Sequence, residues 1–90
     1  MAKRNFDSPE YKAFRLKVLR RDKWCCQMPN CKSRKKMQVH HIIPYYKANL
    51  LELNEHNAIS LCRVCHDSIW GKESFFIKLF SDIVRRKYNK

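Results

Sequence analysis

The stretch VHHIIPYY, residues 39–46, sets two adjacent histidines among β-branched residues and ends the run at Pro44. β-Branched residues favour strands, and proline, which has no N–H group to donate, interrupts them. Neighbouring side chains of a strand point to opposite faces, so His40 and His41 are expected to have different roles. The sequence therefore predicts a short strand over residues 37–43 that presents two imidazoles to two sides.

The chain before this strand is predicted to hold a basic arm, residues 1–7, and a helix, residues 8–21. Ser8 is a typical capping residue, and Pro9 stands at the first helical position, where its missing N–H group is not needed. One face of the helix carries three apolar residues with helical spacing, Tyr11, Phe14 and Val18. Basic side chains occupy much of the rest, so this helix is expected to have one buried face and one solvated face.

The chain after the strand supplies a second strand and two helices. The segment AISL, residues 58–61, is a short strand candidate, and a helix is predicted from Arg63 to about Trp70, closed by Gly71, the only glycine. Residues 73–88 predict an amphipathic helix with a wide apolar stripe. We therefore expect one small α+β domain over residues 1–90, with a ββα core at 24–71 between an N-terminal and a C-terminal helix.

The net charge is +12, from 20 Lys and Arg against 8 Asp and Glu, and residues 1–36 hold 12 of the basic residues against 3 acidic ones. A polyanion is the first partner to expect, DNA or RNA before a membrane surface, because no basic amphipathic anchor stands out. The phosphate contacts are expected on the first helix and on the run KSRKK at 32–36, with four residues foremost: Arg20, Arg21, Lys35 and Lys36. A merely solvated basic face is the alternative.

The first ten residues, MAKRNFDSPE, lack the apolar core of a secretory signal, and no run approaches the roughly 18 apolar residues of a membrane span. We therefore expect a cytoplasmic protein with no membrane association. In that compartment thiols stay reduced, and paired cysteines bind metal more often than they form disulfides.

Four of the five cysteines form two pairs: Cys26 and Cys31 have four residues between them, and Cys62 and Cys65 have two. Each spacing suits a tight turn that points two sulfurs at one tetrahedral ion. The sequence therefore predicts a structural zinc site, which suits a chain too short for a large core. Thiols without an ion are the alternative. Cys25 is interpreted as a spare thiol or small core residue, although it could replace Cys26 as a ligand.

His66 follows the second cysteine pair directly and falls in the predicted helix at 63–70. A ββα unit can bring one imidazole from the strand and one from this helix onto a second metal ion. The sequence therefore predicts two metal sites with different roles, a closed one formed by cysteines and an open one formed by histidines.

Four motifs in this order resemble the HNH nucleases, the ββα-metal or His-Me finger group: RRDKWCCQMPNC, VHHIIP, NAISLC and CRVCH, within about residues 9–73. The resemblance implies that His41 is the general base and that His40 and His66 hold a catalytic divalent ion. It also implies that Asn57 steadies the loop and the base. The four zinc ligands it implies are Cys26, Cys31, Cys62 and Cys65.

The implied activity is that of a metal-dependent DNA endonuclease that hydrolyses phosphodiester bonds by nicking or double-strand cleavage. A partly neutral imidazole can take a proton from water, and a divalent ion can stabilise the leaving oxygen. Some relatives carry a further histidine where this chain has Trp70. This departure favours a weakly held Mg²⁺ or Mn²⁺ and leaves Ni²⁺, Co²⁺ and Zn²⁺ open.

Two other functions remain open from the sequence. One is a non-catalytic, zinc-stapled nucleic-acid-binding protein, and the other is a phage packaging factor that is active only in complex with a phage or host protein. The bare module is of the kind that phages encode, which would place it in the host cytoplasm. We expect a monomer, with a homodimer through the wide apolar stripe as the alternative. Trp24, Tyr45 and Tyr46 are interpreted as core or rim residues rather than as base-stacking ones.

Overall fold

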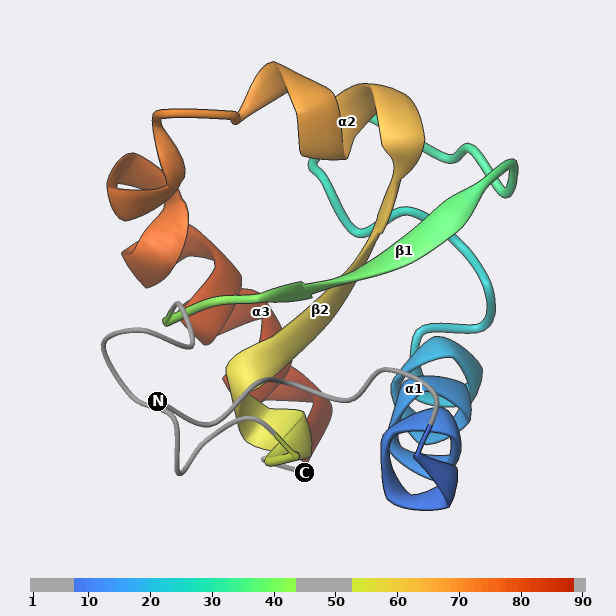
Figure 1. Ribbon diagram of the computed structural model, residues 1–90. Coiled ribbons are helices and arrows are strands. Elements are labelled where there is room, and N and C mark those ends of the chain that lie inside the picture. The colour runs from blue at the N-terminus through green and yellow to red at the C-terminus, as the bar shows by residue number, and fades with distance from the viewer. Residues whose placement is uncertain (1–7, 44–52, 89–90) are drawn as a thin grey trace.

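The computed structural model describes residues 8–43 and 53–88, which form three α-helices around a two-stranded antiparallel sheet (Figure 1). This architecture confirms the predicted α+β class with a helix before and after the ββα unit. The predicted basic arm at 1–7, and Pro44, Tyr45 and Tyr46, lie outside the described residues. Within those residues, no helix is long and apolar enough to cross a membrane.

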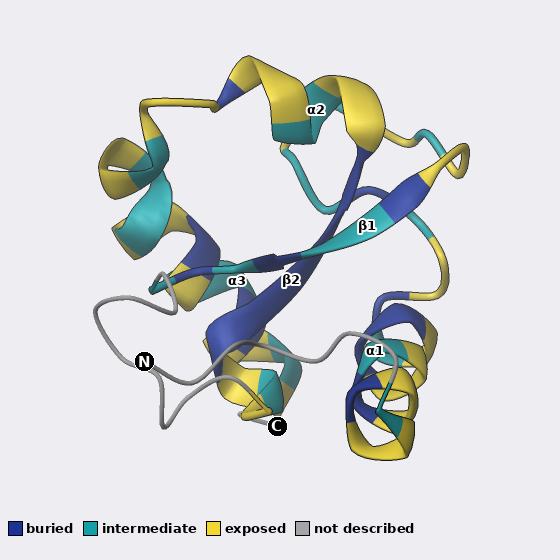
Figure 2. Ribbon diagram, in the orientation of Figure 1, coloured by how far each residue is buried: buried dark blue, intermediate teal, exposed yellow. Residues whose placement is uncertain are grey.

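The sheet pairs β1, Met37–His41, with β2, Ala58–Cys62, and the register places His40 opposite Ile59 and His41 opposite Ala58. β1 is shorter than predicted, because the chain bends after His41. The backbone N–H of Ile42 still donates to the carbonyl of Asn57, over 2.9 Å. β2 is one residue longer than predicted and is buried along its whole length (Figure 2).

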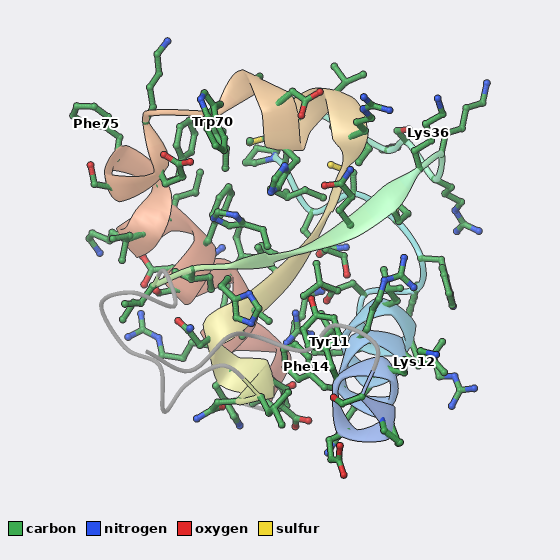
Figure 3. All side chains as sticks on the ribbon, viewed as in Figure 1. Tyr11, Lys12, Phe14, Lys36, Trp70 and Phe75 are labelled. Carbon is green, nitrogen blue, oxygen red and sulfur yellow. The ribbon has the colours of Figure 1, made fainter. Side chains whose placement is uncertain are left out.

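Helix α1, Pro9–Arg21, packs on one face of the sheet. Its start is set by Ser8, whose hydroxyl accepts a hydrogen bond from the backbone N–H of Tyr11 over 3.1 Å. The predicted apolar face is buried: Tyr11, Phe14 and Val18 form a small cluster with Ala58. Figure 3 shows Tyr11 and Phe14 pointing from α1 toward the sheet, whereas Lys12 points away from it.

Helices α2, Arg63–Ser68, and α3, Ile77–Tyr88, contribute to the other cluster, in which Ile69, Phe80 and Val84 pack with sheet residues and cysteines. α2 ends two residues earlier than predicted, since a turn with Gly71 at a φ of +79° redirects the chain. The predicted helix at 73–88 also begins differently. Its first four residues form a 3₁₀ segment, η3, Glu73–Phe76, and α3 starts only at Ile77.

The sheet thus separates two sets of side chains. Ala58 packs with α1, Ile59 and Leu61 belong to the cluster that includes Phe80 of α3, and Val39 contacts both clusters. The 3₁₀ segment η2, Glu55–Asn57, leads directly into β2. This arrangement puts the two adjacent histidines of β1 into two different environments.

Candidate metal centres and the histidine site

The four paired cysteines converge on one point. Their sulfur atoms all lie within 4.8 Å of one another, from the loop after α1 (Cys26, Cys31) and from the junction of β2 and α2 (Cys62, Cys65). The sulfurs of Cys31 and Cys62 are 3.9 Å apart. Two thiolates on a tetrahedral Zn²⁺ at 2.3 Å would be separated by about 3.8 Å, so the donor set and its spacing fit structural zinc.

The thiols of this cluster differ in how readily they lose a proton. A hydrogen bond from the backbone of Cys65 lowers the pKa of the Cys62 thiol from 9.0 to about 7, so this thiol ionises most easily. Burial raises the pKa of Cys26 and, more strongly, that of Cys65. Buried neutral thiols of this kind release their protons when a divalent ion binds. Cys25 stands outside the cluster, with its sulfur 3.7 Å from the carbonyl oxygen of Cys26.

His40 lies on the face of β1 that looks toward α2 and α3. Its ring meets the ring of His66 edge-on, with centroids 5.5 Å apart, and meets the ring of Phe80 in the same way at 5.6 Å. The side chain is buried, and its Nε2 atom has no hydrogen-bond partner among the described residues. A buried imidazole nitrogen without a partner, beside a second imidazole, is the arrangement that a metal ion would satisfy.

The protonation state of His40 agrees with this interpretation. Burial lowers the pKa of His40 from 6.5 to about 4, and the neighbouring His66 lowers it further. The carboxylate of Glu73 acts in the opposite direction, and His41 adds a smaller lowering effect. His40 is therefore neutral at pH 7, and a neutral imidazole offers a lone pair to a cation.

His41 occupies the other face of β1, toward α1. Its ring stacks on Phe14, with centroids 5.7 Å apart and planes 17° from parallel. The side chain is only half-buried. The predicted divergence of the two adjacent imidazoles is thus observed: His40 meets residues of α2 and α3, and His41 meets a residue of α1.

Asn57 ties η2 to the end of β1. Its Oδ1 accepts from the backbone N–H of Ile43 over 2.9 Å, and its Nδ2 donates to the carbonyl of the same residue over 3.1 Å. The side chain thereby holds the segment just after His41 in a fixed position. Asn57 itself is buried, so these two hydrogen bonds also satisfy an amide that would otherwise be costly to bury.

A buried ion pair that the sequence did not reveal connects α1 with β2. The carboxylate of Asp22 accepts two hydrogen bonds from Arg21, at 2.8 and 2.9 Å, and one from the backbone N–H of Ser60, at 2.9 Å. Lys87 of α3 approaches it to 3.5 Å. The signal in the sequence is helical spacing: Arg21 lies three residues after Val18 and seven after Phe14, on the predicted apolar face.

The same guanidinium reaches the turn that carries Asn57. Arg21 donates to the carbonyl oxygens of Glu55, at 2.7 Å, and Ala58, at 2.8 Å. Its side chain is only 11% exposed. The predicted DNA contact at Arg21 therefore has no support in this geometry, since the donors are directed into the protein. Arg20, by contrast, is exposed.

The two remaining predicted DNA contacts, Lys35 and Lys36, line a pocket of about 350 Å³. Lys35 and Lys36 meet the first residues of α2 there, and Arg63 adds a third positive charge. Figure 3 shows Lys36 at the start of β1. The one acidic group of the lining is Asp67, 3.7 Å from Arg63, and both of these side chains are mostly exposed. The pocket is therefore positively charged and open to anions.

Comparison with known proteins agrees with this geometry. Residues 26–69 match the HNH endonuclease family, over a range that begins at the first zinc candidate and includes both strands and α2. No curated protein and no solved structure matches the chain. HNH domains are associated with nuclease activity, nucleic-acid substrates and bound metal. Together with the cysteine cluster and the two-stranded sheet, this match shows that residues 26–69 are similar to an HNH endonuclease domain.

Proposed function

We propose that the protein is a metal-dependent DNA endonuclease that hydrolyses phosphodiester bonds. The observation that carries the proposal is the pair of imidazoles of His40 and His66, 5.5 Å apart, with a buried Nε2 atom on His40 that lacks a partner among the described residues. The match of residues 26–69 to the HNH endonuclease family supports the proposal, because the resemblance to HNH nucleases implies a catalytic ion at this pair.

His40 and His66 are the residues that would hold a divalent cation. Both offer imidazole nitrogen, and the first is kept neutral by burial. When bound, the ion would supply Lewis-acid stabilisation of the negative charge that develops on the phosphate and the leaving oxygen. With two protein ligands, the site is open, in contrast to the closed set of four cysteines.

His41 is proposed as the general base. Its imidazole lies on the opposite face of β1 from His40, so it does not compete for the same ion. Stacking on Phe14 restricts the plane of the ring, and Asn57 fixes the backbone that follows it. A positioned imidazole that is partly neutral near pH 7 can take a proton from the attacking water, an effect typically worth 10²–10⁴-fold in rate.

The pocket at the start of α2 is proposed to hold a backbone phosphate of the substrate. Lys35, Lys36 and Arg63 provide the charge, and the hydroxyl of Ser33 lies in the same lining. Contacts of this kind position nucleic acid without reading its sequence, and they make binding sensitive to salt. Arg20 is a further candidate because its side chain is exposed.

The test is cleavage of supercoiled plasmid by zinc-loaded protein with added Mg²⁺, Mn²⁺, Co²⁺ or Ni²⁺. We expect nicked circles to appear before linear DNA, since one hydrolytic site cuts one strand at a time. His41→Ala is expected to lower the rate by at least 100-fold. His56→Ala is the matched control, because His56 is an exposed histidine whose ring contacts that of Tyr88, and its loss should leave the rate unchanged.

The controls decide how a negative result is interpreted. Each variant is checked for its zinc content and for its circular dichroism spectrum before the assay. If His41→Ala protein cleaves the plasmid at the wild-type rate, His41 is not the general base. Absence of cleavage with every ion, in folded and zinc-loaded wild-type protein, would contradict the endonuclease proposal.

A further inference from the structure

Two aromatic side chains stand in solvent beside the histidine site. Trp70 is 77% exposed and Phe75 is 81% exposed, and neither belongs to the buried clusters of the described residues. Figure 3 shows both on the segment that joins α2 to α3. Exposure of two large rings to water is unfavourable, so their position needs an explanation outside the core.

The setting of these rings is polar rather than apolar. Between them the chain runs Gly71, Lys72, Glu73 and Ser74, of which all but the half-buried Glu73 are exposed. An aromatic ring interleaved with basic and small polar residues is typical of surfaces on which nucleobases stack.

The area of the rings also argues against a protein partner or a second copy of the chain. An aromatic side chain buries at most about 150–250 Å². Two of them reach roughly half of the 800 Å² per partner that a stable protein interface requires. A base, whose flat face matches one ring, needs no larger surface.

The rings continue a line of features along α2. The positively charged pocket includes Arg63, the first residue of the helix, and His66 follows one turn later, about 4.5 Å along the axis. Trp70 comes two residues after the last residue of the helix, Ser68. The charged pocket, the histidine and the Trp70 ring therefore follow one another along one short segment of the chain.

We propose that Trp70 and Phe75 form a stacking platform for unpaired bases of the strand whose phosphate enters the His40–His66 site. The platform rests on the nucleic-acid substrate proposed above and adds a substrate class to it. Stacking requires a base with a free face, so the protein binds single-stranded or locally unpaired DNA in preference to intact duplex. Because every base has such a face, the preference is for structure and not for sequence.

The chain offers a direct optical test because it contains two tryptophans, Trp24 and Trp70. In Trp24→Phe protein only Trp70 emits, and in Trp70→Leu protein only Trp24 does. Both zinc-loaded variants are titrated, without added divalent ion, with a 12-nucleotide single strand, the matching duplex and heparin. Saturation with the oligonucleotides is followed independently by the fluorescence anisotropy of a labelled oligonucleotide. Saturation with heparin is followed by its competition with that labelled oligonucleotide.

We expect the single strand to quench Trp70 emission strongly, the duplex to quench it less, and heparin to leave it unchanged. Trp24 emission is expected to stay unchanged with all three. Trp70→Leu and Phe75→Leu should each weaken single-strand binding about 5- to 100-fold while heparin affinity stays within about twofold. Lys36→Gln, which removes a charge from the pocket, should weaken binding of both polyanions.

Three results would overturn the platform. The first is unchanged Trp70 emission at a single-strand concentration where anisotropy shows saturation. The second is equal quenching by heparin, which would indicate a charge effect and not stacking. The third is a concentration-dependent change in Trp70 emission without DNA, with a dimer in sedimentation, which would assign the rings to a second copy. None of these readouts needs hydrolysis, so they are independent of the cleavage assay.

Discussion

Replacement of Asp22 by asparagine tests the ion pair that joins α1 to β2. The side chain of Asp22 has no solvent exposure, and that of Arg21 has 11%. The two carboxylate oxygens of Asp22 serve the guanidinium of Arg21, the backbone N–H of Ser60 and the ammonium group of Lys87. Asparagine keeps the shape of the side chain, but it has one acceptor oxygen and no charge.

The expected loss follows from what remains after the substitution. One oxygen can serve about half of these donors, and the guanidinium of Arg21 stays buried without its counter-charge. Removal of one partner from a buried pair typically costs about 3–5 kcal/mol. A domain of this size has a free energy of unfolding of about 5–13 kcal/mol, so Asp22→Asn should remove a large fraction of it.

The assay is urea unfolding of zinc-loaded protein, followed by circular dichroism. With a slope of about 1.5 kcal/mol per molar urea, a loss of 3 kcal/mol lowers the midpoint by about 2 M. Asp82→Asn is the matched control, since Asp82 pairs with Arg85 at 2.8 Å and Lys78 at 3.1 Å on the surface of α3. An exposed pair is worth about 0–1 kcal/mol, so the control should shift the midpoint by less than about 0.7 M.

Equal shifts in the two variants would refute this reasoning, because they would show that burial of the Asp22 pair adds nothing. A further effect is expected on the histidine site. Arg21 donates to the carbonyls on either side of the Asn57 turn, so Asp22→Asn should also loosen the backbone after His41. Faster amide exchange at Ile43 in the variant would be the measurable sign.

Three other predictions concern the site itself. Burial lowers the pKa of His40 from 6.5 to about 4, so the unfolded chain binds this proton more readily than the folded protein does. The contribution of neutral His40 to the free energy of unfolding is therefore fully present above pH 6.5 and is lost as pH falls toward 4. Between pH 7 and 5 the loss is about 2 kcal/mol, and urea unfolding of His40→Gln should show a correspondingly weaker pH dependence than wild type. Cys62→Ser should abolish tight zinc binding in elemental analysis, whereas Cys25→Ser should retain one zinc per chain. Asn57→Ala removes both hydrogen bonds to Ile43 and should lower plasmid cleavage at least tenfold with zinc content unchanged; an unchanged rate would remove its positioning role.

The elements that could be predicted are those encoded by short-range pattern. The cap at Ser8, the alternation around His40 and the two cysteine spacings each involve residues close in sequence, and each lies in the expected element. The convergence of the two cysteine pairs follows from the pairing of β1 with β2, which brings Met37 opposite Cys62. The α+β class follows from these patterns together.

The elements that were missed depend on tertiary placement. Arg21 was grouped with the exposed basic residues because a charged side chain is exposed by default. Only the position of β2 shows that Arg21 and Asp22 are enclosed. Helical spacing does place Arg21 on the apolar face, three residues after Val18, and Arg20 away from it, but it does not show what encloses the end of the helix.

The C-terminal region shows the same dependence on geometry. The apolar stripe that is predicted for one helix over residues 73–88 is divided between the 3₁₀ segment η3 and α3. Phe80 and Val84 are buried as expected, but Tyr88 is 39% exposed. The ring of Tyr88 instead contacts the ring of His56, and the two ring centroids are 4.0 Å apart. From the sequence, Trp70 is predicted only as the end of the helix at 63–70 and as the residue in place of a metal-ligating histidine.

The most direct test of the central claim is a titration of zinc-loaded protein with Mn²⁺, observed through the imidazole signals of all four histidines by NMR. Paramagnetic Mn²⁺ broadens the signals of groups that it binds. If His40 and His66 hold the second ion, their signals should broaden first, at low Mn²⁺, while those of exposed His56 remain sharp. Uniform broadening of all four histidines, or none at His40 and His66, would contradict an open metal site at this pair.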